Sequence, residues 1–279
     1  MMRSQCRPCP ATRGFQMKMR LSALLFLATV LPAAAHTPYL VPASFSAREG
    51  DTVTLDAAFA GAFFVPEVAF DNSTCMVTLP TGQSRPVSTV QRLKTRTVLE
   101  DVLDAGKGTY RFSTGPRLGA LFRVWEVDGK RETSRDPAAK IPAGAKVIAN
   151  FQSLTRADAY ITIGAPSRAA LAGGESGLVF VPVTHPDDLY VGEHFEFIVQ
   201  YDGKPVAAQK VEVAEAVWTS DRRPSIQTLQ SDAEGRVRLP LAQAGTFLAL
   251  ARYRSAAPAG APVPEYSNSY TLSFRVLNP

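Results

Sequence analysis

The chain has 279 residues, with 30 Lys and Arg against 25 Asp and Glu and only three His. Five of the basic residues and none of the acidic ones lie in residues 1–35, so the remainder carries 25 charges of each sign and is formally neutral. This balance argues against nucleic-acid binding, which requires a clustered basic surface. The remaining length suffices for two hydrophobic cores, because single domains typically run to about 100 to 150 residues.

Residues 1–35 have the organisation of a secretory signal peptide. Lys18 and Arg20 precede an apolar run over 21–31, and small residues end the segment at Ala35. The apolar run is shorter than the roughly 20 residues that a membrane-spanning helix needs. We therefore expect cleavage after residue 35, a mature chain without a transmembrane segment, and a periplasmic or secreted location.

The cysteines do not predict a disulfide framework. Cys6 and Cys9 lie in the predicted leader, and only Cys75 follows it. We therefore do not interpret the Cys6/Cys9 spacing as a zinc or redox motif. Since a single cysteine cannot form an intrachain disulfide, the mature fold must be stabilised by packed cores.

Residues 36–165 are predicted to form an antiparallel β-sandwich. Apolar or alternating segments recur along this stretch between Gly, Pro, Asn and Asp, and no long segment keeps the helical period of about 3.6 residues. Asp128–Gly129 is expected to be a hairpin turn, and the polar segment 131–140 a surface loop. We expect strands over 40–45, 52–56, 75–80, 83–90, 109–114, 122–127, 146–151 and 158–163, and either an edge strand or one helical turn over 98–103.

A second sandwich is predicted over residues 178–279, after a linker of small residues at 166–177. The segment 193–201 should bury Phe195, Phe197 and Val199 on one face, because alternate residues of a strand point the same way. The other strands are expected over 178–183, 210–217, 236–241, 246–251 and 270–276. The fold class is therefore predicted to be all-β, with two antiparallel sandwiches of which the second is immunoglobulin-like or transthyretin-like.

Three turn motifs in the second half, Tyr201–Val206, Ser231–Arg236 and Ala244–Phe247, resemble those of carboxypeptidase-regulatory-like and transthyretin-like sandwiches. Together with the opening Ala-His-x-x-Tyr-Leu-x-Pro at 35–42, they make the mature chain similar to the DUF4198 family of secreted bacterial proteins. Some members of that family are periplasmic metal-binding components found beside nickel and cobalt importers. The resemblance therefore implies a nickel- or cobalt-binding protein whose partner is a membrane metal importer.

His36 is the preferred metal ligand. Cleavage after residue 35 would make it the N-terminal residue, whose α-amine and imidazole together can chelate nickel, cobalt, copper or zinc. Phe63 and Phe64 are expected in a loop near this terminus, where they either pack in the core or wall the site. The alternative for His36 is a frayed terminus without a role.

The other two histidines are weaker candidate ligands. His185 precedes Pro-Asp-Asp, a sequence typical of a turn, and a role as a metal ligand is the alternative. His194 and Glu196 are two residues apart on a predicted strand, so they share a side and could offer an imidazole and a carboxylate. A solvent-facing polar side of that strand explains the same pattern.

Three classes of function are left open by these features. The preferred one is a periplasmic metal-binding accessory protein that supports metal uptake. The second is a structural or adhesive cell-surface module that binds protein or glycan through Trp125, Trp218 or Tyr266. The third is a copper histidine-brace enzyme, which would need a second histidine beside His36. Conventional catalysis is not expected, because the sequence has no nucleophile–base motif, phosphate loop or paired acidic signature.

Overall fold

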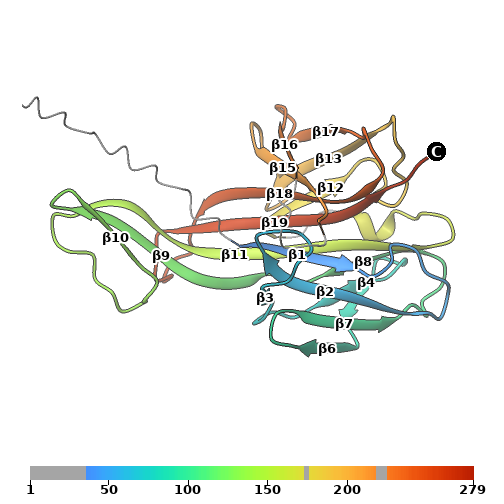
Figure 1. Cartoon of the computed structure of the whole chain (residues 1–279), viewed down its shortest axis with the longest axis horizontal. Coiled ribbons are helices and arrows are strands. Elements are labelled where there is room, and N and C mark those ends of the chain that lie inside the picture. The colour runs from blue at the N-terminus through green and yellow to red at the C-terminus, as the bar shows by residue number, and fades with distance from the viewer. Residues whose placement is uncertain (1–35, 173–175, 218–224) are drawn as a thin grey trace, which may run out of the picture. The chain divides into compact units, whose positions relative to one another are not determined.

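The computed structural model describes residues 36–172, 176–217 and 225–279, and these ranges are built almost entirely of β-strands (Figure 1). Helical structure within them amounts to one short 3₁₀ turn, η1 (Ala169–Leu171). None of the helical residues described is part of a helix long and apolar enough to span a bilayer. The predicted all-β fold class is confirmed, whereas the predicted signal peptide lies outside the described residues.

A five-stranded sheet begins the fold, in the order β1-β2-β7-β6 with β3 beside β2. Its strands are β1 (Thr37–Pro42), β2 (Thr52–Ala60), β3 (Val68–Ala69), β6 (Thr89–Arg92) and β7 (Thr97–Val102). The first two predicted strands, over 40–45 and 52–56, correspond to β1 and β2, which pair with each other. The segment over 98–103 is a strand between β2 and β6, so it is neither a helical turn nor a sheet edge.

The second sheet has ten strands, in the order β16-β15-β18-β19-β11-β8-β4-β5, with β9 beside β11 and β10 beside β9. Its strands are β4 (Met76–Thr78), β5 (Ser84–Pro86), β8 (Gly108–Ser113), β9 (Arg117–Val127), β10 (Lys130–Ser134), β11 (Lys146–Ile163), β15 (Lys210–Glu215), β16 (Ile226–Gln230), β18 (Gly245–Ala256) and β19 (Glu265–Val276). β11 is one strand of 18 residues, where we predicted two strands over 146–151 and 158–163.

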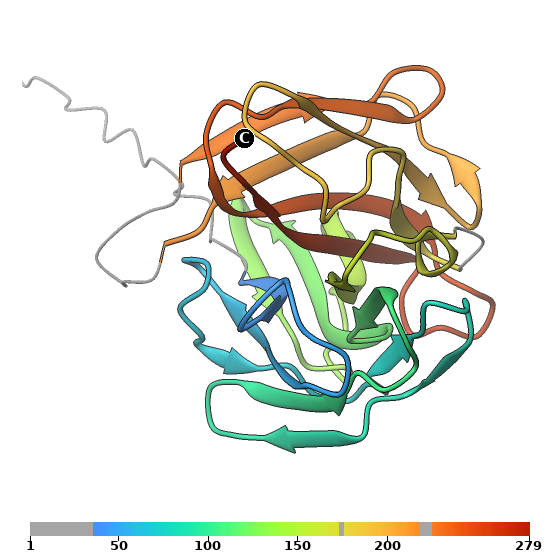
Figure 2. The ribbon, with the colours of Figure 1, turned by 90° about the vertical axis from the view of Figure 1, so that its right-hand side faces the viewer.

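β11 connects the two predicted sandwiches. Its N-terminal part pairs with β9, its C-terminal part pairs with β8, and residues Phe151–Ala159 pair in parallel with Glu265–Ser273 of β19. The other strand ladders of the described residues are antiparallel. Figure 2 shows β11 running beside the C-terminal strands. Contacts group Ala35–Pro279 into one compact unit. The domain boundary at 166–177 stays a prediction.

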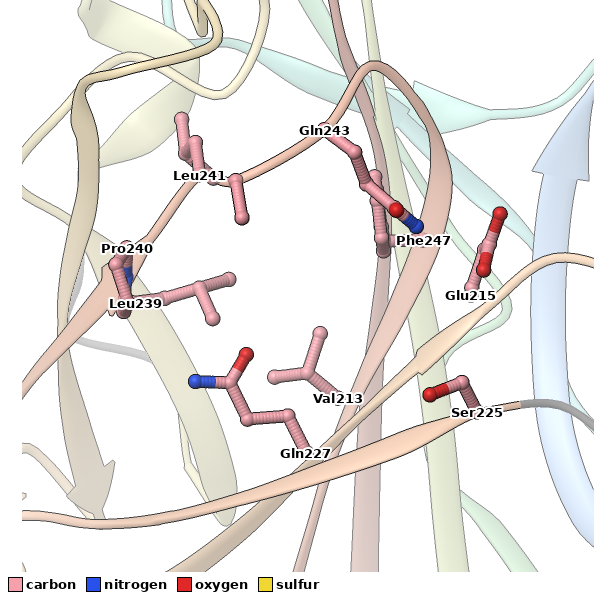
Figure 3. A pocket seen from close by; sticks show the side chains of 10 residues that line it. Val213, Glu215, Ser225, Gln227, Leu239, Pro240, Leu241, Gln243 and Phe247 are labelled. Carbon is pink, nitrogen blue, oxygen red and sulfur yellow. The ribbon is translucent and has the colours of Figure 1, made fainter.

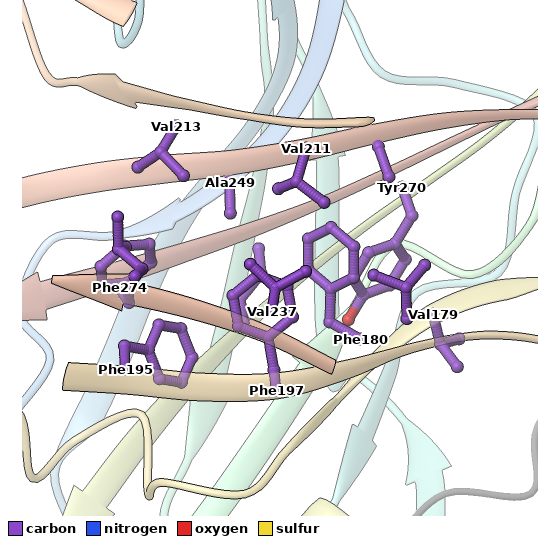
Figure 4. Close-up of a cluster of buried hydrophobic side chains, with 14 of the residues drawn as sticks. Val179, Phe180, Phe195, Phe197, Val211, Val213, Val237, Ala249, Tyr270 and Phe274 are labelled. Carbon is purple, nitrogen blue, oxygen red and sulfur yellow. The ribbon is translucent and has the colours of Figure 1, made fainter. Parts of the chain in front are cut away.

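The third sheet covers the C-terminal core. It consists of β12 (Leu178–Pro182), β13 (His194–Tyr201), β14 (Lys204–Pro205) and β17 (Arg236–Pro240). As predicted, Phe195, Phe197 and Val199 of β13 share a buried face. They pack against β18 and β19, where the Phe195 and Phe274 rings lie 5.0 Å apart (Figure 4). Tyr270 of β19 belongs to the same core.

β9, β10 and residues 146–154 of β11 form a β-ribbon, here called the arm, and the part of it that contains β10 extends beyond the ends of β18 and β19 (Figure 1). The predicted turn at Asp128–Gly129 joins β9 to β10, with φ angles of 51° and 71° that suit a tight hairpin. The prediction of a surface loop over 131–140 was wrong for its first part. Pairing with β9 orders the polar residues 130–134 as strand β10.

Candidate functional site

Three neighbouring strands bring His36 and Glu67 together. His36 immediately precedes β1, whose first residue, Thr37, lies opposite Ala60 at the end of β2. Glu67 immediately precedes β3, and its amide donates to the carbonyl of Phe59 in β2 at 3.1 Å. His36 Nε2 consequently lies 2.7 Å from Glu67 Oε2, with side chains 50% and 43% exposed. The pair is reachable from solvent.

The Glu67 carboxylate is fixed from a second direction by Gly61, whose amide donates to Oε1 at 2.7 Å. This amide, and then the His36 ring, hold the pKa of Glu67 below its usual value against the opposing effect of partial burial. An ionised carboxylate only accepts hydrogen bonds, so His36 Nε2 carries the hydrogen and donates it. Nδ1 is then the nitrogen of the neutral His36 ring that has a free electron pair.

This arrangement fits a transition metal in part. Metal-binding histidines usually donate their second ring N–H to a carboxylate or carbonyl, as His36 does to Glu67. Among the described residues, no three His, Cys, Asp or Glu side chains are grouped closely enough to hold an ion. His36 would therefore supply the protein's donor atoms, with Glu67 as its orienting partner. We did not predict Glu67, although it is the only charged residue over 57–70.

His185 lies in a different environment, where it is 6% exposed. Its Nε2 is 2.9 Å from Thr109 Oγ1 and 3.1 Å from the carbonyl of Ser167, and its Nδ1 accepts from the amide of Asp187 at 3.1 Å. Because a carbonyl cannot donate, Nε2 carries the hydrogen. Burial lowers the pKa of His185, which keeps the ring neutral. Both ring nitrogens are thus engaged within the fold.

The hydrogen bonds continue from His185 to a carboxyl group. Thr109 Oγ1 donates to Thr162 Oγ1 at 3.0 Å, and Thr162 Oγ1 donates to Asp187 Oδ2 at 2.6 Å. Burial raises the pKa of Asp187 to about 7, opposed by the Thr162 hydrogen bond and the charge of Arg275. These residues, here called the His185 network, join β8, β11 and the loop after β12.

His194 and Glu196 of β13 have arginines as their partners. Arg238 lies 3.4 Å from His194 Nδ1, and Glu196 pairs with both Arg236 and Arg238 at 3.1 Å. Two guanidinium groups would repel a cation at this place. The three histidines of the chain therefore have separate partners, and the structure does not bring His185 or His194 into the His36–Glu67 pair.

The aromatic residues singled out in the sequence are mostly core residues. Phe63 and Phe64 are 7% and 5% exposed, and the Phe64 ring packs edge-to-face on Tyr39 at 5.0 Å. Of the two expectations for this loop, core packing is the one the structure shows. Trp125 is also buried, Tyr266 is half-buried, and Trp218 lies outside the described residues.

A cavity of about 210 Å³ opens between β15, β16, β17 and β18 (Figure 3). Its walls are mainly the apolar side chains of Val213, Leu239, Leu241 and Phe247, with Gln227 at the rim. None of the site residues predicted from the sequence lines it. The cavity therefore adds nothing to the metal hypothesis.

No curated protein matches the chain. The adhesin InvE of Yersinia pseudotuberculosis is 13% identical, with a TM-score of 0.21 over 85% of this chain and 58% of that chain. The D0–D1 domains of intimin are 12% identical, with a TM-score of 0.21 over 84% and 96%. The Escherichia coli adhesin FdeC is 15% identical, with a TM-score of 0.21 over 85% and 63%. This chain thus spans little more than half of the InvE chain, and such TM-scores support no inference about function.

One family model matches the sequence over residues 33–255, and it is described as a domain of unknown function, DUF4198. The match begins just before His36, includes Glu67, and continues through β11 to the end of β18. It therefore covers most of the chain, with the whole first predicted sandwich and residues 178–255 of the second. The chain belongs to the DUF4198 family, as its opening residues and turn motifs predicted.

Proposed function

We propose that the processed chain is a periplasmic metal-binding accessory protein, which holds one divalent transition-metal ion through the α-amine and Nδ1 of His36. The observation that carries this proposal is the 2.7 Å hydrogen bond from His36 Nε2 to Glu67, which leaves Nδ1 as the basic ring nitrogen. The family resemblance favours nickel or cobalt. Two nitrogen donors also suit copper or zinc.

The solvent exposure of the His36–Glu67 pair favours delivery of the ion over its storage. His36 and Glu67 are each about half exposed, at 50% and 43%, and one residue supplies the donor nitrogens. Most coordination positions would then be filled by water or by a partner. A partly coordinated ion exchanges ligands readily, which suits transfer to a membrane importer.

Metal binding should weaken in mild acid. The ion must compete with protons for the α-amine and the imidazole nitrogen of His36. Loss of either nitrogen opens the chelate ring. We therefore expect the affinity to fall as the pH is lowered.

The test is calorimetric titration of the full mature chain with nickel, cobalt, copper and zinc chlorides. Protein whose first residue is His36 is compared with protein that carries one added Gly before it. The added residue blocks the amine and keeps the ring, so we expect binding at least about 100-fold weaker. Glu67→Gln should bind about 10- to 100-fold more weakly, because it weakens the orienting hydrogen bond.

His194→Ala is the matched control, since it removes an imidazole that faces Arg238 and should leave the affinity unchanged. Equal affinities with and without the added Gly would overturn the proposal. Mass spectrometry of the exported protein supplies an independent test. A first residue other than His36 would also overturn it.

A second function, adhesion to another protein, is favoured by exposed apolar residues on the arm. Leu118, Val147 and Ile148 are 50%, 52% and 43% exposed. The register of β11 against β9 shifts between Val147 and Ala149, which places neighbouring apolar side chains in solvent. The double variant Val147→Glu/Ile148→Glu should then lose cell-surface binding and keep its metal affinity. Unchanged cell-surface binding in this variant would contradict adhesion through the arm and leave the metal function alone.

A further inference from the structure

Four segments far apart in the sequence meet where β11 and β19 end. The loop between β1 and β2 joins the end of β11 through a backbone bridge between Ser46 and Thr162. The loop between β12 and β13 joins the end of β19 through a second bridge, between Tyr190 and Leu277. Beside it, the amide of Leu277 donates to the carbonyl of Leu189 at 2.9 Å. These backbone contacts fix the four segments relative to one another.

A cavity of about 250 Å³ opens between these segments, and we call it the Asp187–Arg275 pocket. Phe45 and Leu277 supply part of its apolar wall. Six of its eleven lining residues have polar side chains, namely Ser46, Thr162, Asp187, Asp188, Tyr190 and Arg275. The pocket is therefore suited to a small polar ligand.

Arg275 lines the pocket from β19. Its Nη2 donates to Ser46 Oγ at 2.7 Å, and its guanidinium carbon lies 5.8 Å from the centre of the Phe45 ring. Within residues 36–172, 176–217 and 225–279, no ion pair joins Arg275 to a carboxylate. Since a guanidinium group has five N–H donors, Arg275 can bind a further acceptor.

Asp187 presents a carboxyl group to the same pocket. Its Oδ2 accepts from Thr162 Oγ1 at 2.6 Å, so the His185 network holds this side chain in place. Burial raises the pKa of Asp187 to about 7, and the charge of Arg275 opposes that rise. Arg275 is thus near enough to act on the charge of Asp187, although no ion pair joins the two in the part of the chain described. A ligand with two opposite charges could bridge them.

We propose that the Asp187–Arg275 pocket binds a small zwitterion of the α-amino acid class, with the carboxylate of the ligand on Arg275 and its ammonium group on Asp187. Arginine matches the geometry of carboxylate oxygens. An ionised Asp187 accepts hydrogen bonds from an ammonium group. The volume of about 250 Å³ lies just below the usual range for sites of drug-sized ligands, which suits a molecule as small as alanine.

The second acidic residue of the lining favours a zwitterion over a simple anion. Asp188 is exposed at the pocket, and with Asp187 it sets two acidic groups against one arginine. An anion without an amine would be repelled by them. A cation without a carboxylate would be repelled by Arg275. In a zwitterion, each charge of the ligand meets an opposite charge of the pocket.

Calorimetric titration of the full mature chain tests this proposal with L-alanine, sodium acetate and methylammonium chloride as probes. We expect L-alanine to bind at least about tenfold more tightly than either singly charged probe. Arg275→Gln and Asp187→Asn should each weaken the binding of L-alanine at least about tenfold. The fold should survive Asp187→Asn, because an amide oxygen can still accept from Thr162. Arg131→Gln and Asp104→Asn are the matched controls, since they remove the same charges at exposed positions and should leave the affinity unchanged.

Proton release provides a second readout. At about pH 6 the carboxyl group of the free pocket is largely protonated, because the pKa of Asp187 is about 7. Arg275, Asp188 and Tyr190 line the same pocket, and the neutral His185 accepts from the Asp187 amide. An ammonium group on Asp187 lowers its pKa, so L-alanine should release about one proton per site, measured from the dependence of the binding enthalpy on the ionisation enthalpy of the buffer.

Four results would overturn the proposal. They are no binding of L-alanine, equal affinity for acetate and L-alanine, unchanged affinity in Arg275→Gln and Asp187→Asn, and proton uptake in place of release.

Discussion

The His36–Glu67 pair and the His185 network place the same residue type in opposite surroundings. His36 is half exposed and has one side-chain partner, whereas His185 is 6% exposed and is bonded through both ring nitrogens. The first histidine can exchange protons and ligands with solvent. The second is needed by the fold, because it satisfies groups from three segments. The comparison teaches that the partners of a histidine decide its role more than its rarity in the sequence does.

The largest expected effect is a difference in protein stability between substitutions of the two histidines. His185→Ala leaves the Ser167 carbonyl and the Asp187 amide without their partner and opens a cavity, so we expect a loss of about 3 kcal/mol of unfolding free energy. His36→Ala should change it by less than about 0.5 kcal/mol. Urea denaturation monitored by fluorescence measures both. A loss below about 1 kcal/mol for His185→Ala would contradict the structural role.

A second, smaller effect concerns pH. The folded chain keeps the proton of Asp187 up to about pH 7, whereas the unfolded chain loses it near 3.8. Between these values the folded state binds more protons, so the Asp187 contribution lowers stability as pH rises. His185 acts in the opposite sense, because its unfolded form takes up a proton below about 6.5 and its buried form does not. The charge of Arg275 opposes the rise in the pKa of Asp187. Near His185, the charge of Asp188 opposes the lowering of the pKa, and the charge of Arg168 adds to it.

Asp187→Asn isolates the carboxyl contribution, since an amide oxygen can still accept from Thr162. We expect the stability of this variant relative to the wild type to increase by about 1 to 2 kcal/mol between about pH 5 and about pH 7.5. Denaturation curves at the two pH values measure the difference. A difference that does not depend on pH would show that Asp187 is ionised throughout the range.

The smallest expected effect on stability is that of a substitution in the exposed His36–Glu67 pair. Glu67→Gln should lower the unfolding free energy by about 0.5 kcal/mol or less, because exposed ion pairs contribute little. Added salt should reduce even this difference. The same substitution is expected to lower metal affinity about 10- to 100-fold, so the two measurements together distinguish a binding pair from a structural one. A large loss of stability would instead show that the fold needs Glu67, as it needs the His185 network.

Local signals in the sequence predicted much of the fold. Alternation located β13 with its buried Phe195 and Phe197, and the Asp128–Gly129 turn located the β9–β10 hairpin. The length of β11 escaped this reasoning, because the mainly polar residues from Gln152 to Arg156 interrupt its apolar pattern. In the structure Arg156 pairs with Asp158. Asp158 also accepts a hydrogen bond from the Tyr270 hydroxyl, 112 positions further along the chain.

The candidate site was predicted only in part, for a similar reason. His36 was found from the cleavage pattern before it, a signal contained in a few consecutive residues. Glu67 lies 31 residues away and reaches His36 through the pairing of three strands. The partners of His185 lie up to 76 positions from it in the chain, the largest separation being that of Thr109. Such non-local contacts depend on sheet register, which a single sequence does not specify.

β11 pairs with strands of both halves of the chain, and this pairing determines what happens when the backbone is cut between them. A backbone cut within 166–177 would separate β11 from β19, whose ladder runs from the Phe151–Glu265 pair to the Ala159–Ser273 pair. Each fragment would then present an open strand edge, which promotes aggregation. The two fragments should be soluble together, by reassociating along that ladder, and insoluble apart. Neither half is then a module that could be transplanted into another protein on its own.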